Sequence, residues 1–162
     1  MLSRLDYCNA ILVGLPQTTL SSLQRVLHAA AQMVLNLRPR DHVTPSLLEL
    51  HWLPIAERID FKLCLLVHKA LDGHAPQYIA DLITPVTDLP LRASLRTALS
   101  GDLYVPRTCR KLGDRAFAVV APRVWNRFVY LLTSNSTSRR QHLSNAVLKL
   151  FYLTGLSLNI CK

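Results

Sequence analysis

The fold of this chain is decided by residues 50–73, which read LHWLPIAERIDFKLCLLVHKALDG. Pro54 suits the first turn of a helix, where its missing N–H group would have no partner within the helix anyway. Gly73 suits the left-handed position just after a helix, because glycine adopts positive φ angles without steric cost. The sequence therefore predicts one helix from about Ile55 to Asp72.

One half of this predicted helix is apolar. Outside that half, Arg58, Lys62 and Lys69 form a narrow basic line, with Phe61 and His68 beside it. The basic line is explained either as a solvated face or as a ridge that faces phosphates. At about 100° per residue, nine side chains fall on the apolar half and are expected to be buried: Ile55, Ala56, Ile59, Leu63, Cys64, Leu66, Val67, Ala70 and Leu71.

Further helices are expected on both sides of the central one, separated by prolines. Thr18 or Thr19 is a suitable cap for the second of them, and Thr44-Pro45 opens the third. Helices joined by proline turns favour compact antiparallel packing. The apolar spacing predicts these helices over residues 2–13, 20–37, 46–50 and 76–83.

The second half of the chain is less regular. Asp114 is expected to cap a turn of helix over residues 115–120, which Ala121-Pro122 interrupts before the helix resumes. Residues 103–107 are expected to form a short extended piece. A last helix is expected around residues 143–154, where apolar residues share one side.

The predicted fold is mainly α: a small helical bundle with a long basic loop or short extended segment and a C-terminal helix. Residues 1–85 form the predicted helical core, residues 86–112 a loop or linker, and residues 113–162 a basic C-terminal helical segment. Hydrophobic residues make up 50% of the 162 and charged residues 18%. A chain of this length and apolar content is able to form one domain with a sizeable core.

The composition points to an intracellular protein, in the nucleus or the cytoplasm. No window approaches the roughly 18 uninterrupted apolar residues of a membrane span, so no membrane partner is expected. Residues 1–6 lack the apolar core of a signal peptide. The four cysteines are scattered without metal or disulfide spacing and are expected to be reduced thiols.

The net charge of +9 is unevenly distributed. Residues 1–91 carry seven Lys and Arg against eight acids, and residues 141–162 carry two Lys and no acid. Residues 92–140 carry ten Lys and Arg against Asp102 and Asp114, a balance of plus eight. A basic segment of this kind is typical of a surface that binds phosphates.

Patterns of known enzyme classes are absent from the sequence. It has no glycine-rich phosphate loop, no Gly-x-Ser-x-Gly elbow and no His-Glu-x-x-His pair. Glu57 and Asp60 are explained by the preference for acids in the first turn of a helix. His51 is explained better as a capping or packing residue than as a catalyst. We therefore predict no catalytic residue, no cofactor and no metal site.

Several blocks of the chain together resemble the non-LTR (LINE-type) retrotransposon polyproteins, in the region downstream of their reverse-transcriptase palm. The blocks cover about residues 2–127. They are Ser3-Arg4-Leu5-Asp6-Tyr7-Cys8-Asn9, Gly14-Leu15-Pro16, Leu23-Gln24-Arg25-Val26, Ala29-Ala30-Ala31, Leu47-Leu48-Glu49-Leu50-His51-Trp52-Leu53-Pro54, Arg58-Ile59, Phe61-Lys62, Lys69-Ala70-Leu71, Gly73, Ala75-Pro76, Val105-Pro106-Arg107-Thr108, Gly113-Asp114-Arg115-Ala116-Phe117, Ala121-Pro122 and Trp125-Asn126.

The resemblance implies descent from the polymerase thumb and the segment after it, which in that family grips template and primer. The family continues Trp-Asn with a short residue and Leu-Pro, whereas this chain continues with Arg127-Phe128-Val129-Tyr130. The resemblance also implies that the chain starts after the palm. It contains no adjacent aspartate pair for the two magnesium ions of nucleotidyl transfer, so polymerase activity is not expected.

The resulting prediction is sequence-tolerant binding of RNA or DNA. Between residues 92 and 140, arginines alternate with five aromatic rings, Tyr104, Phe117, Trp125, Phe128 and Tyr130. Arginine binds phosphate and rings stack on bases. The alternative is that the rings, Phe117 and Trp125 above all, are core residues and the arginines only confer solubility. The predicted contacts are Arg107, Arg110, Lys111, Arg115, Arg123, Arg127, Arg58, Lys62 and Lys69.

A second hypothesis has no nucleic-acid role. The chain is then a helical protein-interaction module, or a vestigial one, that self-associates through exposed apolar faces. The 50% hydrophobic composition motivates this hypothesis. Salt-dependent binding of nucleic acid separates the first hypothesis from the second.

Overall fold

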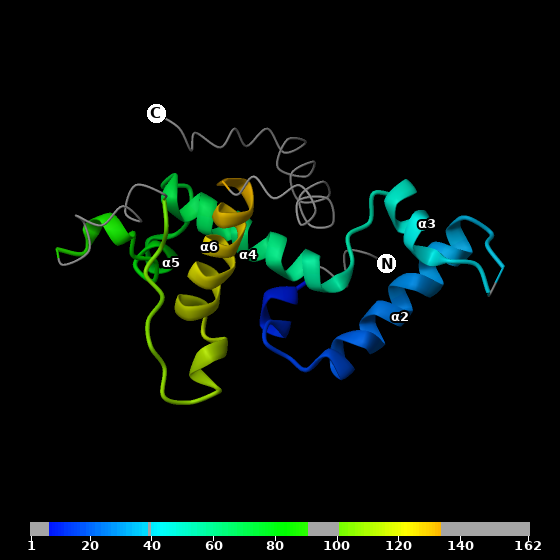
Figure 1. Ribbon diagram of the computed structural model, residues 1–162, viewed down its shortest axis with the longest axis horizontal. Coiled ribbons are helices and arrows are strands. Elements are labelled where there is room, and N and C mark those ends of the chain that lie inside the picture. The colour runs from blue at the N-terminus through cyan, green and yellow to red at the C-terminus, as the bar shows by residue number, and fades with distance from the viewer. Residues whose placement is uncertain (1–6, 39, 91–100, 134–162) are drawn as a thin grey trace. The chain divides into compact units, whose positions relative to one another are not determined.

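A computed structural model of the chain describes residues 7–38, 40–90 and 101–133 (Figure 1). Side chains are described up to Tyr130. The fold is mainly helical, as predicted. The chain divides into two compact units, residues 1–60 (the N-terminal unit) and residues 61–162 (the C-terminal unit). The three-part division at residues 85 and 112 stays a prediction, because compact packing does not show which parts fold alone.

The central helix forms as predicted. α4 spans Ile55–Leu71, and Gly73 follows it with a φ angle of 73°. The N–H of Gly73 donates to the carbonyl oxygen of Ala70 at 3.3 Å, and the N–H of His74 donates to that of Lys69 at 2.8 Å. These two bonds form a Schellman motif, which satisfies carbonyl groups that the helix end leaves open. The predicted stop signal is confirmed.

The buried face of α4 is shorter than predicted. Ala56 and Leu71 are exposed, contrary to the prediction. Leu71 is the last residue of the helix, whereas Ala56 lies beside the buried Ile55, so the buried face at the start of α4 is narrower than the predicted half. His68, placed outside the apolar half, is buried, and its Nδ1 lies 2.9 Å from Oδ2 of Asp72. Five of the nine predicted side chains are buried: Ile55, Ile59, Leu63, Cys64 and Val67.

The first described element is shorter than the helix predicted over residues 2–13. It is a single 3₁₀ turn, η1 (Asn9–Leu12), because Cys8 before it adopts a left-handed conformation with a φ angle of 55°. A continuous right-handed helix cannot contain such a residue. Gly14 follows with a φ angle of 69°, which confirms the predicted stop. Residues 2–6 of the predicted helix lie outside the described residues.

α2 spans Gln17–Val34, three residues nearer the N-terminus than predicted at both ends. Thr18 and Thr19 do not cap it. Pro16 occupies the N-cap position, and its carbonyl oxygen accepts from the N–H of Thr19 at 3.0 Å. The helix ends early because Asn36 adopts a φ angle of 50°, which asparagine tolerates better than most residues.

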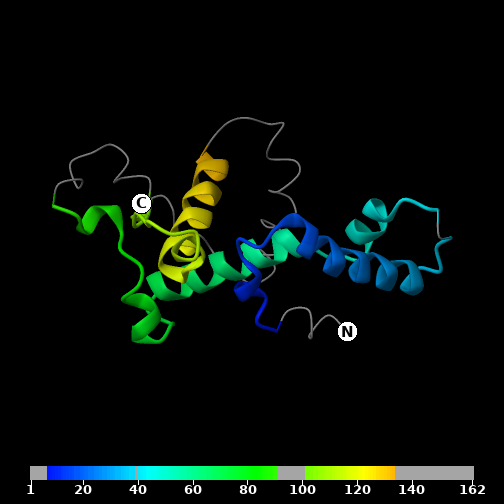
Figure 2. The ribbon, with the colours of Figure 1, turned by 90° about the horizontal axis from the view of Figure 1, so that it is seen from below.

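α3 spans Val43–Glu49 and also begins three residues before the predicted start. Its early start places Pro45 in the first turn, where no N–H group is needed. His51 stops the helix with a φ angle of 54°, and the N–H of Trp52 donates to the carbonyl oxygen of Leu47 at 2.8 Å. His51 was predicted to be a capping or packing residue, and its exposed side chain and left-handed backbone, just after the C-cap residue Leu50, fit the first of these roles. α3 packs alongside α2 (Figures 1 and 2).

One glutamine connects α2 to the start of α4 within the N-terminal unit. The side-chain oxygen of Gln24 accepts from the N–H of Ile55 at 2.9 Å, and its nitrogen lies 2.7 Å from Nε2 of His28. The first N–H groups of a helix have no partners within the helix. Gln24 therefore caps α4 from another helix.

The C-terminal unit contains an isolated β-bridge between two extended segments. α5 (Gln77–Ala80) is followed by the 3₁₀ turn η2 (Val86–Asp88). Pro85 and Leu103 form an antiparallel bridge, with the N–H of Tyr104 donating to the carbonyl oxygen of Thr84 at 2.8 Å. The extended piece predicted over residues 103–107 is thus confirmed at its first residues. Residues 91–100 lie outside the described residues.

α6 spans Phe117–Thr133 without a break. The predicted interruption at Ala121-Pro122 is therefore wrong. Pro122 lacks the N–H group that would donate to the carbonyl oxygen of Ala118, and a proline inside a helix costs roughly 3 kcal/mol. Its ring is fully buried, and burial of apolar surface offsets part of that cost.

Trp125 and Asn126 of α6 hold the extended piece in place. Oδ1 of Asn126 accepts from the N–H of Leu103 at 2.8 Å, while its Nδ2 donates to the carbonyl oxygen of Leu103 at 2.8 Å. Nε1 of Trp125 donates to the carbonyl oxygen of Gly101 at 3.2 Å. The Asn126 amide thus pairs with both backbone groups of a residue that is 3% exposed.

Two further predictions concern the C-terminal helix and membrane spans. The helix expected around residues 143–154 lies outside the described residues. Among the helices that are described, none combines the length and the apolar character needed to cross a membrane.

Candidate nucleic-acid interface

Four of the predicted contact residues lie on the loop between the extended piece and α6. Arg107, Arg110 and Lys111 are exposed. Arg115 is half-buried and ends the 3₁₀ turn η4 (Gly113–Arg115). We name the three exposed residues the basic loop. They lie within five consecutive positions of the chain, so a single stretch of phosphate backbone is able to contact all of them.

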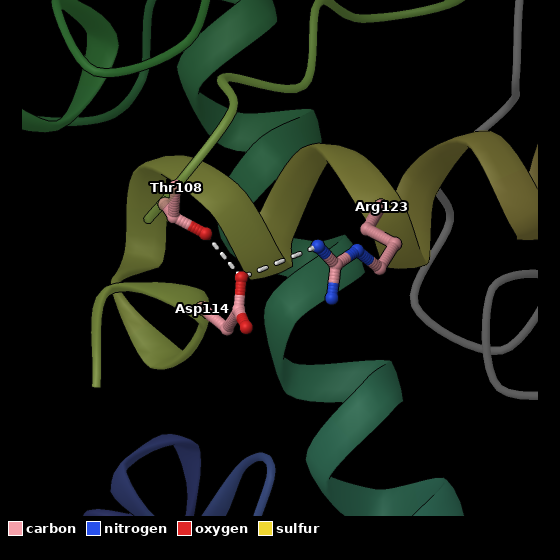
Figure 3. Close-up of polar contacts among 3 residues, drawn as sticks. All are labelled: Thr108, Asp114 and Arg123. Atoms are coloured by element: carbon pink, nitrogen blue, oxygen red, sulfur yellow. Dashed lines mark hydrogen bonds and ion pairs between the residues drawn. The ribbon is translucent and has the colours of Figure 1, made fainter. Parts of the chain in front are cut away.

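A hydrogen bond joins side chains on the two sides of Arg110 and Lys111. The hydroxyl of Thr108 donates to Oδ1 of Asp114 (Figure 3). A Cβ atom on Gly113 would lie 3.3 Å from Cγ2 of Thr108, which is tighter than an ordinary contact. The small residue at position 113 therefore lets the two ends of the loop approach each other.

Asp114 has a different role from the predicted one. It does not cap α6, because it lies within η4 and its carboxylate accepts from Thr108 instead. Oδ1 of Asp114 also lies 3.9 Å from Nη2 of Arg123 on α6 (Figure 3). The side chains of this ion pair are 46% and 58% exposed, so it contributes little to stability. It does bring Arg123 to the base of the basic loop.

Arg123 and Arg127 both lie exposed on α6, one helical turn apart. Like charges at this spacing weaken a helix slightly, and an anion bound between them would remove that repulsion. Over residues 101–130 the chain has six Lys and Arg against two acids, a balance of plus four. Asp102 is half-buried, and Asp114 already interacts with Thr108 and Arg123. The exposed charge of this region is therefore positive.

The predicted basic line on α4 is only partly realised. Arg58 is half-buried, and its Nε donates to the carbonyl oxygen of Leu53 at 2.9 Å. Its guanidinium thus supports the turn before α4. Lys62 and Lys69 are exposed on α4 in the C-terminal unit, as predicted.

The five aromatic rings of the basic segment separate into two groups. Trp125 and Phe128 are buried and pack with a centroid distance of 6.4 Å and an interplanar angle of 47°. Tyr104 and Phe117 are half-buried. Tyr130 is 65% exposed. The core interpretation holds for Trp125, and Tyr130 is the ring with most surface for a ligand.

The sequence did not indicate that the Asp114 carboxylate interacts with both Thr108 and Arg123. The available signal was its place in the block Gly113-Asp114-Arg115, six residues after the Thr108 of another block.

The described residues contain no group of three or more His, Cys, Asp or Glu side chains able to hold a metal ion. Comparisons with protein family models, with curated proteins and with solved structures gave no match.

Proposed function

We propose that this chain is a non-catalytic, sequence-tolerant nucleic-acid-binding protein that grips the backbone of RNA or DNA through residues 101–130. Its descent is from the region after the palm of a LINE-type reverse transcriptase. It acts inside the cell, in the nucleus or the cytoplasm. The observation that carries the proposal is the exposure of five cationic side chains within residues 101–130, where the Asp114 carboxylate already interacts with Thr108 and Arg123. The five are Arg107, Arg110, Lys111, Arg123 and Arg127.

The resemblance adds a second line of support. Residues in the resembling blocks position the basic loop: Thr108 pairs with Asp114, Gly113 permits their approach, and Asn126 binds Leu103. A scaffold made of these residues is expected if the loop is the part of the ancestral protein that contacts nucleic acid. The exposed Arg and Lys side chains of the basic loop are the groups that bind phosphate oxygens.

The first prediction concerns the basic loop. The triple variant Arg107→Gln, Arg110→Gln and Lys111→Gln is expected to weaken RNA binding and to lower the slope of log affinity against log salt by about 2. The reason is that each phosphate contact on a single strand contributes roughly 0.7 to that slope. Fluorescence anisotropy with a labelled oligouridine across a salt series measures both quantities. Arg115 stays unchanged because it is half-buried.

A matched control removes three exposed charges from the N-terminal unit: Arg25→Gln, Arg38→Gln and Arg40→Gln. Both triple variants lower the net charge from +9 to +6. The control is expected to keep most of the slope. Equal losses in the two variants would show that total charge, and not the basic loop, governs binding. No binding of the unchanged chain at low salt would reject the proposal.

The second prediction concerns Asp114, whose substitution raises the net charge of the chain instead of lowering it. Asp114→Asn keeps an oxygen that accepts from Thr108 and removes the carboxylate near Arg123. The variant is expected to bind oligouridine roughly 2- to 5-fold more tightly, because one more cation faces the phosphates without a competing acid. The same anisotropy titration measures the gain. Unchanged or weaker binding by a variant with an unaltered melting temperature would contradict the assignment of Arg123 to the interface.

A second candidate function has its own observation. α2 exposes apolar side chains, with Met33 80% and Val34 56% exposed. An open depression of about 400 Å³ lies beside them, lined by Ala29, Gln32, Met33, Asn36 and Leu37. These features suit a helical interaction module that associates with a second copy of itself. Concentration-dependent sedimentation that Met33→Ser abolishes would support this function, and a monomer at all concentrations would count against it.

A further inference from the structure

Three exposed side chains form a line on α6. Arg123, Arg127 and Tyr130 are spaced at i, i+4 and i+7, and all three are exposed. At 3.6 residues per turn they fall within a stripe about 60° wide, and at 1.5 Å per residue they extend over about 10 Å. We name these three residues the α6 stripe. It carries two guanidinium groups and one aromatic ring on the same side of a single helix.

The ring of Tyr130 differs from the other rings of this helix. α6 buries Trp125 and Phe128, which pack against each other. Tyr130 is 65% exposed although its ring is largely apolar. A tyrosine ring combines a flat apolar surface with a polar end, and such a ring beside arginines is the composition of base-stacking surfaces.

The arginines of the stripe suit phosphate groups near that ring. Arg127 lies three residues before Tyr130 and therefore projects from the neighbouring turn. Arg123 is 3.9 Å from the Asp114 carboxylate, in an exposed pair that a phosphate is able to replace. A strand that runs along α6 would thus meet a ring first and two cations after it, or the reverse.

We propose that the α6 stripe is a stacking platform for single-stranded nucleic acid, with one base on Tyr130 and the adjoining phosphates on Arg127 and Arg123. Single strands are the expected ligand because the faces of bases in a duplex are covered by their neighbours, whereas a base in a single strand exposes its π face. This inference rests on the proposed function and assigns its ligand class. The basic loop supplies charge to either form, and Tyr130 supplies the preference.

The test compares two labelled probes, an oligouridine and a duplex RNA of equal length, at one fixed salt concentration. Tyr130→Ala in the full chain is expected to lower affinity for oligouridine roughly 5- to 100-fold, the range found for loss of one base-aromatic stack. Affinity for the duplex should change less than about 2-fold, because the base faces in a duplex are covered and cannot stack on Tyr130. Tyr130→Phe should bind oligouridine like the unchanged chain, because the ring is kept.

A matched control removes another exposed tyrosine of the C-terminal unit. Tyr78 on α5 is 70% exposed, and Tyr78→Ala is expected to leave both affinities unchanged. The salt slope should be the same in all tyrosine variants, since none alters a charge. Melting temperatures of the variants should match that of the unchanged chain, because Tyr130 is exposed.

The outcomes separate this inference from the proposed function. A steep salt slope that the basic-loop variant lowers, together with equal oligouridine binding by Tyr130→Ala and the unchanged chain, would overturn the stacking platform alone. Equal losses on the duplex and the single strand would also overturn it. Failure of the unchanged chain to bind either probe would reject both, and self-association lost in Tyr130→Ala would instead assign the ring to a protein contact.

Discussion

Asn126→Ala is expected to lower the free energy of unfolding by about 2–4 kcal/mol. The side-chain amide of Asn126 bonds both the N–H and the carbonyl oxygen of Leu103, each at 2.8 Å. Leu103 is 3% exposed, so water has little access to these groups after the substitution. A buried backbone group without a partner costs roughly 1–3 kcal/mol. Equilibrium unfolding in urea, followed by circular dichroism, measures the loss.

Two companion variants make this prediction specific. Asn126→Asp keeps an acceptor for the N–H of Leu103 but turns a negative oxygen toward its carbonyl group, so a loss at least as large as that of Asn126→Ala is expected. Gln77→Ala removes an exposed amide that donates to Asp81 at 2.7 Å and should cost less than about 0.5 kcal/mol. If Asn126→Ala cost no more than Gln77→Ala, the amide would not hold the extended piece.

The central helix was predictable because its signals are local. Pro54 and Gly73 lie next to the ends of the helix that they mark, and the spacing of apolar residues between them has the helical period. The buried positions in its middle, such as Leu63 and Val67, follow from that period alone. At the ends, burial depends on what else covers the helix, and Ala56 and Leu71 were therefore predicted wrongly.

Two helix bounds were mispredicted because residues other than glycine interrupt the helix there. Cys8 and Asn36 have φ angles of 55° and 50°. The left-handed region costs most residues roughly 1–2 kcal/mol, so sequence rules expect glycine there. Tertiary packing determines whether another residue takes such a conformation. Tertiary packing also explains Pro122. Local propensity predicts a break in the helix at this proline, but its ring is fully buried and α6 continues through it.

For the candidate interface, the sequence located the charge but not its arrangement. Counting arginines was sufficient to place the basic segment between residues 92 and 140. The exposure of Arg107 and the engagement of Arg58 with Leu53 depend on the fold. The contacts of Asn126 with Leu103 join residues 23 apart in the chain, and no periodic pattern indicates such a pair.

Leu63→Ala is expected to destabilise the chain by about 3–5 kcal/mol, whereas Leu71→Ala on the same helix should cost less than about 1 kcal/mol. Leu63 is 1% exposed in the middle of α4, and its truncation removes buried apolar surface and leaves a cavity. Leu71 is 45% exposed at the last position of the helix, so water already contacts much of its side chain. Urea unfolding of the two variants measures the difference.

The pair tests burial with helix propensity held constant, because both variants replace leucine with alanine in one helix. Sequence periodicity alone predicts similar losses, since it places both leucines on the apolar half. Unequal losses in the stated order would show that packing around the middle of α4 carries the stability. Equal losses would mean that Leu71 is covered in solution, and the exposed apolar surface assigned to the end of α4 would then belong to an interface.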